Sequence, residues 1–118
     1  MANLKLINPP KDLYDKIREL SKKLVIEQEV LLSGIIQYAM ENKDKFEIHP
    51  LKNPPGNEKQ TIEIIIPIGT LDIKKDFLRW GFKHGRTKYS IQTLFVILKF
   101  FEFEEELPKK YLDRSIKL

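Results

Sequence analysis

The first residues of the chain alternate between apolar and polar side chains, which is the spacing of a half-buried β-strand. Within Asn3 to Ile7, Leu4 and Leu6 fall on one face, and Asn3 and Lys5 fall on the other. If this alternation holds, Asn3 and Lys5 point away from the core, whereas a pairing that slips by one residue would expose the two leucines. The pattern therefore predicts a short strand, in a register that the double proline after it leaves open.

Asn8-Pro9-Pro10 separates this strand from a helical pattern, because proline suits the first turn of a helix. The next apolar residues are spaced by four, three and four positions, which predicts an amphipathic helix: Leu13, Ile17, Leu20 and Leu24. After a break near Val25–Glu27, a second helix is predicted to about Asp44. Apolar residues surround nearly its whole circumference: Val30, Leu31, Leu32, Ile35, Ile36, Tyr38 and Ala39. Such a helix must be buried by a partner surface.

The same pattern begins again after residues 47–60, a proline-rich segment that we interpret as a linker. Thr61 to Ile66 predicts a strand that Pro67 closes, with Thr61, Glu63 and Ile65 on its polar face. An amphipathic helix is predicted from about Leu71, and an apolar helix from Ile91 to Phe101. Strand, proline, amphipathic helix, turn and buried helix thus occur twice, about 57 residues apart if Pro67 corresponds to Pro10.

Composition excludes several classes of protein. The 118 residues are 42% hydrophobic and 32% charged, which is typical of a globular protein. With no cysteine and two isolated histidines, we expect no disulfide, no metal site and no cofactor. No nucleophile–base arrangement or phosphate-binding loop is present, so we expect no enzyme. No signal peptide or membrane span is apparent, which indicates a cytoplasmic protein without membrane contact.

The positive charge is concentrated in the second half of the chain. Residues 1–58 carry 9 basic and 9 acidic side chains, whereas residues 59–118 carry 12 and 8, which accounts for the whole net charge of +4. Lys75, Arg79 and Lys83 form a stripe at four-residue steps, which is either a solvated helix face or a surface for a polyanion. Beyond it, Gly85 ends one helix and Thr87 can cap the next.

This order of elements resembles the ribbon-helix-helix family of transcriptional regulators, to which the Arc and methionine repressors belong. The resemblance covers about residues 2–45 and 61–103, and its clearest motif is Gly85-Arg86-Thr87. It implies a mainly α fold with a short antiparallel β-ribbon, built from two tandem ribbon-helix-helix units. The expected organisation is unit 1 at residues 1–46, the linker at 47–60, unit 2 at 61–103 and a C-terminal tail at 104–118.

In that family, strands of two units pair into a ribbon that enters the major groove, and phosphates bind at the start of the second helix. The resemblance therefore implies a sequence-specific regulator that binds double-stranded DNA as a homodimer or larger oligomer. The implied ribbon residues are Asn3, Lys5 and Asn8, and the implied phosphate contacts are Arg86, Thr87 and Lys88, with the basic stripe Lys75, Arg79 and Lys83 facing DNA.

Two departures from the family predict that the units are specialised, with the first unit supplying the ribbon side chains that contact bases and the second unit supplying the phosphate contacts. The first turn, Val25 to Glu29, holds two carboxylates that would repel phosphate. The second strand presents Thr61, Glu63 and Ile65, a poor match for base edges except that Glu63 can accept a hydrogen bond from cytosine. Tandem units also look like small regulators of archaeal viruses, which would place the protein in the host cytoplasm. The excess of lysine over arginine, 17 to 4, is a hyperthermophile tendency.

Two alternatives remain open. An antitoxin or other protein-binding module would use the tail from Glu102 to Leu118 to wrap a partner. A helix-turn-helix protein would have its turn at Gly85 and its recognition helix at residues 88–101, but that helix has too few polar positions to contact base edges.

Overall fold

The computed structural model describes residues 2–46, 61–83, 89–102 and 107–112, and for residues 81–83 the backbone alone. In these ranges the order strand, helix, helix occurs twice. The elements are β1 (Ala2–Ile7), α1 (Lys11–Leu24), α2 (Gln28–Glu41), β2 (Glu63–Gly69), α3 (Leu71–Lys83) and α4 (Tyr89–Glu102). Short 3-10 helices, η1 (Lys43–Phe46) and η2 (Lys109–Tyr111), follow α2 and α4. The predicted pair of strands and the predicted helices are confirmed.

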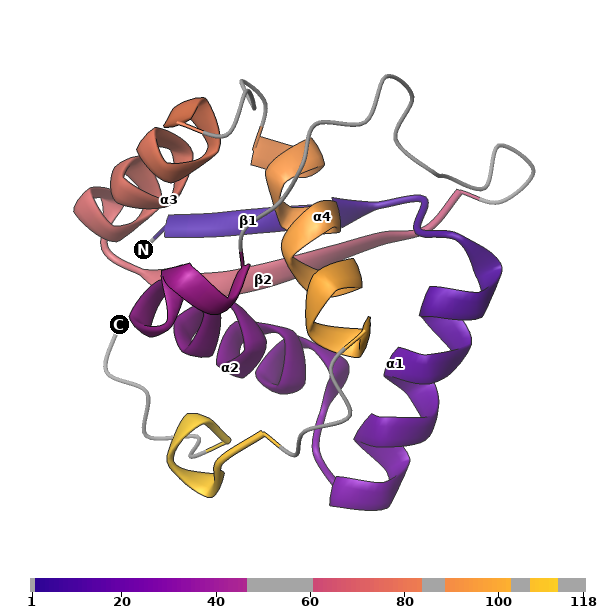
Figure 1. Ribbon diagram of the computed structural model, residues 1–118. Coiled ribbons are helices and arrows are strands. Elements are labelled where there is room, and N and C mark those ends of the chain that lie inside the picture. Colours follow the sequence, from indigo (N-terminus) through magenta and orange to yellow (C-terminus); the bar gives the residue numbers. More distant parts are fainter. Residues whose placement is uncertain (1, 47–60, 84–88, 103–106, 113–118) are drawn as a thin grey trace.

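β1 and β2 pair with each other in antiparallel orientation, so a single chain forms a complete two-stranded ribbon (Figure 1). Ala2, Leu4 and Leu6 are buried, while Asn3 and Lys5 are exposed. The alternation of the first strand therefore holds, and the slipped register that would expose the leucines does not occur. The structural reason is that the leucine face of β1 is needed to cover the apolar helices.

The predicted end of the second strand was wrong, because β2 continues through Pro67 to Gly69. Pro67 lies opposite Asn3, next to an irregularity of pairing between Ala2 and Asn3. A strand of a two-stranded ribbon has one unpaired edge, where a residue without an N–H is tolerated. The carbonyl oxygen of Pro67 accepts a hydrogen bond from Ser33 Oγ at 2.6 Å, which ties β2 to α2.

The predicted spacing of the repeat was also wrong. The first residues of α1 and α3, Lys11 and Leu71, are 60 residues apart. The first residues of α2 and α4, Gln28 and Tyr89, are 61 residues apart. The counterpart of Pro10 is therefore Thr70 rather than Pro67. Thr70 caps α3, since its Oγ1 accepts the backbone N–H of Ile73 at 3.3 Å.

α2 packs on β2 and α4 packs on β1, and the two helices contact each other (Figure 1). Both were predicted to be the most buried helices, and this is confirmed: Leu31–Ile36, Tyr38 and Ala39 are buried in α2, and Gln92–Ile97 and Phe100 in α4. The partner surface that each helix requires is the other half of the same chain. The two halves thus share one hydrophobic core.

Part of the predicted tail, residues 107–112, packs on α2. Leu107 and Tyr111 are buried, and the Tyr111 ring stands edge-on to Tyr38 with 5.4 Å between ring centroids. The Tyr111 hydroxyl donates a hydrogen bond to the Glu41 carboxylate, and Lys110 Nζ lies 4.0 Å from the same group. Within the described ranges, no helix combines the length and apolarity needed to cross a membrane.

Candidate nucleic-acid interface

The face of the ribbon that points away from the helices is the candidate interface. We call it the outer face, and its side chains are Asn3, Lys5 and Ile7 from β1 and Glu63, Ile65 and Pro67 from β2. Across the ribbon, these residues form three opposed pairs: Asn3 with Pro67, Lys5 with Ile65, and Ile7 with Glu63. All except the half-buried Pro67 are exposed. The structure thus brings the predicted readers Asn3 and Lys5 together on one accessible face.

Lys5 is held by an ion pair across the ribbon. Its Nζ lies 3.1 Å from Oε1 of Glu63, which is its diagonal neighbour, and both side chains are about half exposed. Ion pairs this exposed are worth roughly 0–1 kcal/mol, because water and salt screen them. Lys5 can therefore exchange Glu63 for another acceptor at little cost. The pair also leaves the outer face without net charge, so the ribbon itself contributes no long-range attraction to phosphate.

Asn8 closes the end of the ribbon. Its backbone N–H donates to the carbonyl oxygen of Ile62 and its Oδ1 accepts from the N–H of Ile62, both at 2.7 Å. Asn8 has φ of 44°, in the left-handed region that asparagine tolerates better than most residues. Its side-chain oxygen is thus committed to the fold, and the DNA contact predicted for Asn8 would have to use Nδ2. This structural role was not predicted from the sequence, although an asparagine before two prolines was an available signal for it.

The basic stripe on α3 is partly described. Lys75 is exposed, and Arg79 Nη1 lies 2.7 Å from Oδ1 of Asp76 in an exposed pair. As with Lys5, a pair of this kind is weak enough for a phosphate to displace the carboxylate. The side chain of Lys83 and the predicted phosphate contacts Arg86, Thr87 and Lys88 lie outside the described residues.

The two helices that face each other across the core begin with different charges. α2 is preceded by Glu27 and has Glu29 in its first turn, whereas the first turn of α4 contains no acidic residue. The N-terminus of a helix carries partial positive charge that attracts phosphate, and nearby carboxylates cancel it. Of the two helix starts, the one at α4 therefore has the first turn whose charges oppose an anion less.

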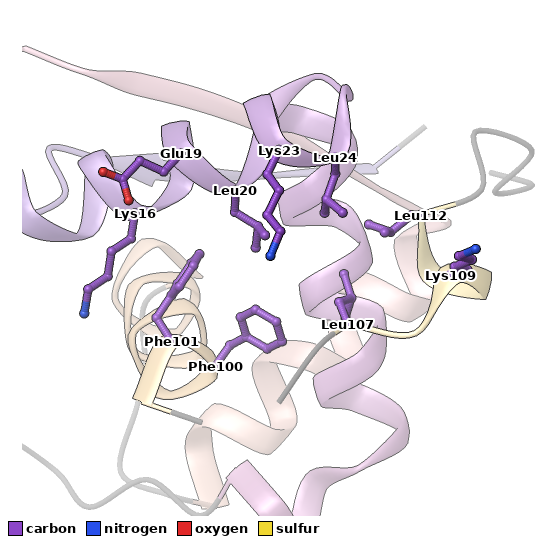
Figure 2. Close-up of a pocket in the computed structure, with 10 residues that line it drawn as sticks. All are labelled: Lys16, Glu19, Leu20, Lys23, Leu24, Phe100, Phe101, Leu107, Lys109 and Leu112. Atoms are coloured by element: carbon purple, nitrogen blue, oxygen red, sulfur yellow. The ribbon is translucent and has the colours of Figure 1, made fainter. Parts of the chain in front are cut away.

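A groove of about 430 Å³ lies elsewhere on the protein, between the C-terminal halves of α1 and α4 and the segment 107–112. Apolar side chains form most of its wall: Leu20, Leu24, Phe100, Phe101, Leu107 and Leu112. Charged side chains surround them: Lys16, Glu19, Lys23 and Lys109. Figure 2 shows the Lys23 side chain extending from α1 toward Phe100. No outer-face residue lines the groove, so it is separate from the ribbon. The groove was not predicted from the sequence, because its wall comes from three segments that are distant along the chain.

The described residues contain no group of three or more histidine or acidic side chains arranged to bind a metal ion. Comparisons of the chain with protein-family models, with curated proteins and with solved structures each find no match.

Proposed function

We propose that the protein is a sequence-specific regulator of transcription that binds double-stranded DNA in the manner of ribbon-helix-helix proteins, and that it has no enzymatic activity. The observation that carries the proposal is the antiparallel ribbon, with one face buried under α2 and α4 and Asn3 and Lys5 exposed on the other. The major groove of B-DNA is about 12 Å wide and admits a two-stranded β-ribbon. In this position the exposed side chains of the ribbon would point at base edges.

The outer face supplies several kinds of base contact. The Asn3 amide can donate to and accept from adenine, and the Lys5 ammonium can donate to O6 and N7 of guanine. Ile7 and Ile65 can pack on thymine methyl groups. Phosphate contacts come from the basic half of the chain in the proposal: Lys75, Arg79, Lys83, Arg86, Thr87 and Lys88.

One chain suffices for the proposed binding unit, because both strands of the ribbon come from it. The homodimer or larger oligomer expected from the sequence would then place two complete ribbons side by side on DNA rather than complete a single ribbon. In this proposal the regulator acts in the cytoplasm, which is that of the host if the gene is viral.

The test is a titration of labelled duplexes across a salt series, with a selected site and a random duplex compared. Lys5→Ala should weaken binding to the selected site about 5- to 150-fold, the equivalent of roughly 1–3 kcal/mol, and weaken binding to random DNA far less. Arg86→Ala should weaken binding to both duplexes and reduce the slope of log affinity against log salt by about 0.9 for each phosphate that Arg86 binds. Lys16→Ala, on the exposed surface of α1, is the matched control and should change neither.

A protein-binding module is the second candidate, and the chemistry of the outer face favours it. Ile7 and Ile65 are 43% and 49% exposed there, and the Lys5–Glu63 pair leaves the face neutral. Wrapping of a partner by the tail is a weaker possibility than the sequence indicated, because residues 107–112 already pack on α2. Failure to bind any duplex from a random pool at low salt would favour this candidate over DNA binding.

A further inference from the structure

The two halves of the ribbon are related by an approximate two-fold axis that passes between Lys5 and Ile65. These two residues lie opposite each other, and they are also 60 residues apart, the step that relates α1 to α3. Each is therefore both the neighbour and the structural counterpart of the other. In a ribbon made by two identical chains, both positions would hold the same residue.

On the buried face of the ribbon, the residues related by this symmetry are chemically similar. The same step relates Leu4 to Ile64 and Leu6 to Ile66, and all four side chains are buried. The helices that cover them, α2 and α4, are both apolar and both buried along most of their length. The two halves therefore contribute similar buried apolar surfaces to the core.

On the outer face the symmetry is broken. The counterpart of Asn3 is Glu63, and the counterpart of Lys5 is Ile65. All the side-chain N–H donors of the outer face therefore come from β1, while β2 offers a carboxylate and apolar atoms. One end of the face carries Asn3 beside Pro67, and the other carries Ile7 beside Glu63. The helix starts also differ, but in the opposite sense, because α2 of the first half has Glu27 and Glu29, whereas the first turn of α4 in the second half has no acidic residue.

We propose that one chain binds a non-palindromic DNA site in a single orientation. This inference rests on the proposed function and concerns the kind of site that is recognised. An amide and an ammonium select adenine and guanine, whereas a carboxylate accepts hydrogen bonds from the amino group of cytosine, and isoleucine contacts the thymine methyl. The two ends of the outer face thus favour different base pairs. Turning the chain by half a revolution on its site would exchange these ends and remove the matched contacts.

The experiment is selection of binding sites from a pool of random duplexes with the full chain, followed by footprinting of one bound chain. We expect the segment protected by one chain to lack inverted symmetry. Replacing one half of that segment by the inverted copy of the other should lower affinity about 5- to 150-fold. The number of chains per duplex, counted by native mass spectrometry, separates one asymmetric site from two sites placed side by side.

A matched variant restores symmetry to the outer face. Glu63→Asn combined with Ile65→Lys gives β2 the same Asn and Lys positions that β1 has, at exposed sites where the fold should tolerate them. The sites that this variant selects should gain inverted symmetry, and circular dichroism confirms that it is folded. The reverse variant, Asn3→Glu with Lys5→Ile, removes all outer-face N–H donors and should lose selectivity.

The outcomes are distinguishable. A palindromic consensus within the segment protected by one wild-type chain would overturn the inference and leave DNA binding intact. Salt-dependent binding without any enriched sequence would overturn both this inference and the sequence specificity of the proposed function, because the outer face would then recognise no bases. Absence of DNA binding by the folded wild-type chain would overturn the proposed function, and this inference with it.

Discussion

The backbone carbonyl of Tyr111 lies directly against the Cα of Gly34, in the buried face of α2, where a β-carbon would overlap it. This close approach lets the segment 107–112 settle on α2, with Leu107 and Tyr111 buried. Glycine inside a helix costs up to about 1 kcal/mol relative to alanine. Here the helix bears that cost in exchange for contact with a segment that follows α4 in the chain.

Gly34→Ala should therefore lower the free energy of unfolding, although the same change in an open helix raises it. We expect a loss of about 1–3 kcal/mol from the forced displacement of the segment, measured as the shift of the urea midpoint. Gln37→Ala, at a half-buried position of the same helix, is the control and should have a small effect. A rise in stability of Gly34→Ala would show that the segment does not press on α2 in solution.

The pKa of Tyr111 is raised above its ordinary value of 10.0, chiefly by burial and further by its hydrogen bond to Glu41. The folded protein thus favours the protonated hydroxyl. The stability that Tyr111 contributes should be complete below about pH 10 and decline as pH rises through the raised pKa. The difference in free energy of unfolding between the wild type and Tyr111→Phe should accordingly shrink as pH rises above about 10.

Glu41→Gln tests how far the Glu41 carboxylate contributes to the raised pKa of Tyr111. It removes the carboxylate and its charge, so the pKa of Tyr111 should fall toward its ordinary value without reaching it, because burial is the larger cause. Ultraviolet titration, with the Tyr111→Phe curve subtracted, follows this hydroxyl alone. An ordinary pKa of Tyr111 in the wild type would contradict the buried position of this side chain.

Val25 ends α1 in the left-handed region, with φ of 55°, and its side chain is 83% exposed. A β-branched residue is strained there, since the left-handed conformation costs roughly 1–2 kcal/mol for residues with a β-carbon. Val25→Gly should raise the free energy of unfolding by about 0.5–1 kcal/mol after the greater freedom of glycine in the unfolded chain is subtracted. Val25→Ala keeps the β-carbon and should gain less. Equal gains for both variants would point away from backbone strain.

Gln92 and Thr93 are neighbours in α4, and replacing each by an apolar residue should change the free energy of unfolding in opposite directions. Both are fully buried, but the Gln92 amide has no hydrogen-bond partner in the described part of the chain, while Thr93 Oγ1 donates to the Tyr89 carbonyl at 2.7 Å. Gln92→Leu should raise the free energy of unfolding by about 1–3 kcal/mol, because it removes an unpaired buried amide. Thr93→Val should lower it by about 0.5–1.5 kcal/mol. Chemical denaturation of both variants tests the pair, and destabilisation by Gln92→Leu would reveal that the amide has a partner in solution.

Local patterns in the sequence determined most of the secondary structure. Alternation placed Leu4 and Leu6 on the buried face of β1 and Asn3 and Lys5 on the exposed one, and apolar residues around α2 and α4 showed that both helices are buried. These properties depend on residues a few positions apart, which a sequence displays directly. The end of β2 was mispredicted for a related reason: the rule that proline closes a strand does not hold at the unpaired edge of a two-stranded ribbon.

The tertiary structure alone decided which surfaces meet. A buried helix needs a partner surface, but periodicity does not show whether that surface belongs to a second chain or to the other half of the same chain. The pairing of Lys5 with Ile65 within one chain shows that it belongs to the other half. The Lys5–Glu63 pair, the hydrogen bonds between Asn8 and Ile62, and the wall of the groove likewise join segments that are far apart along the chain. Such contacts depend on how whole elements pack in space, because free energy is gained when surfaces are buried together, and no spacing along a single segment records which surfaces those are.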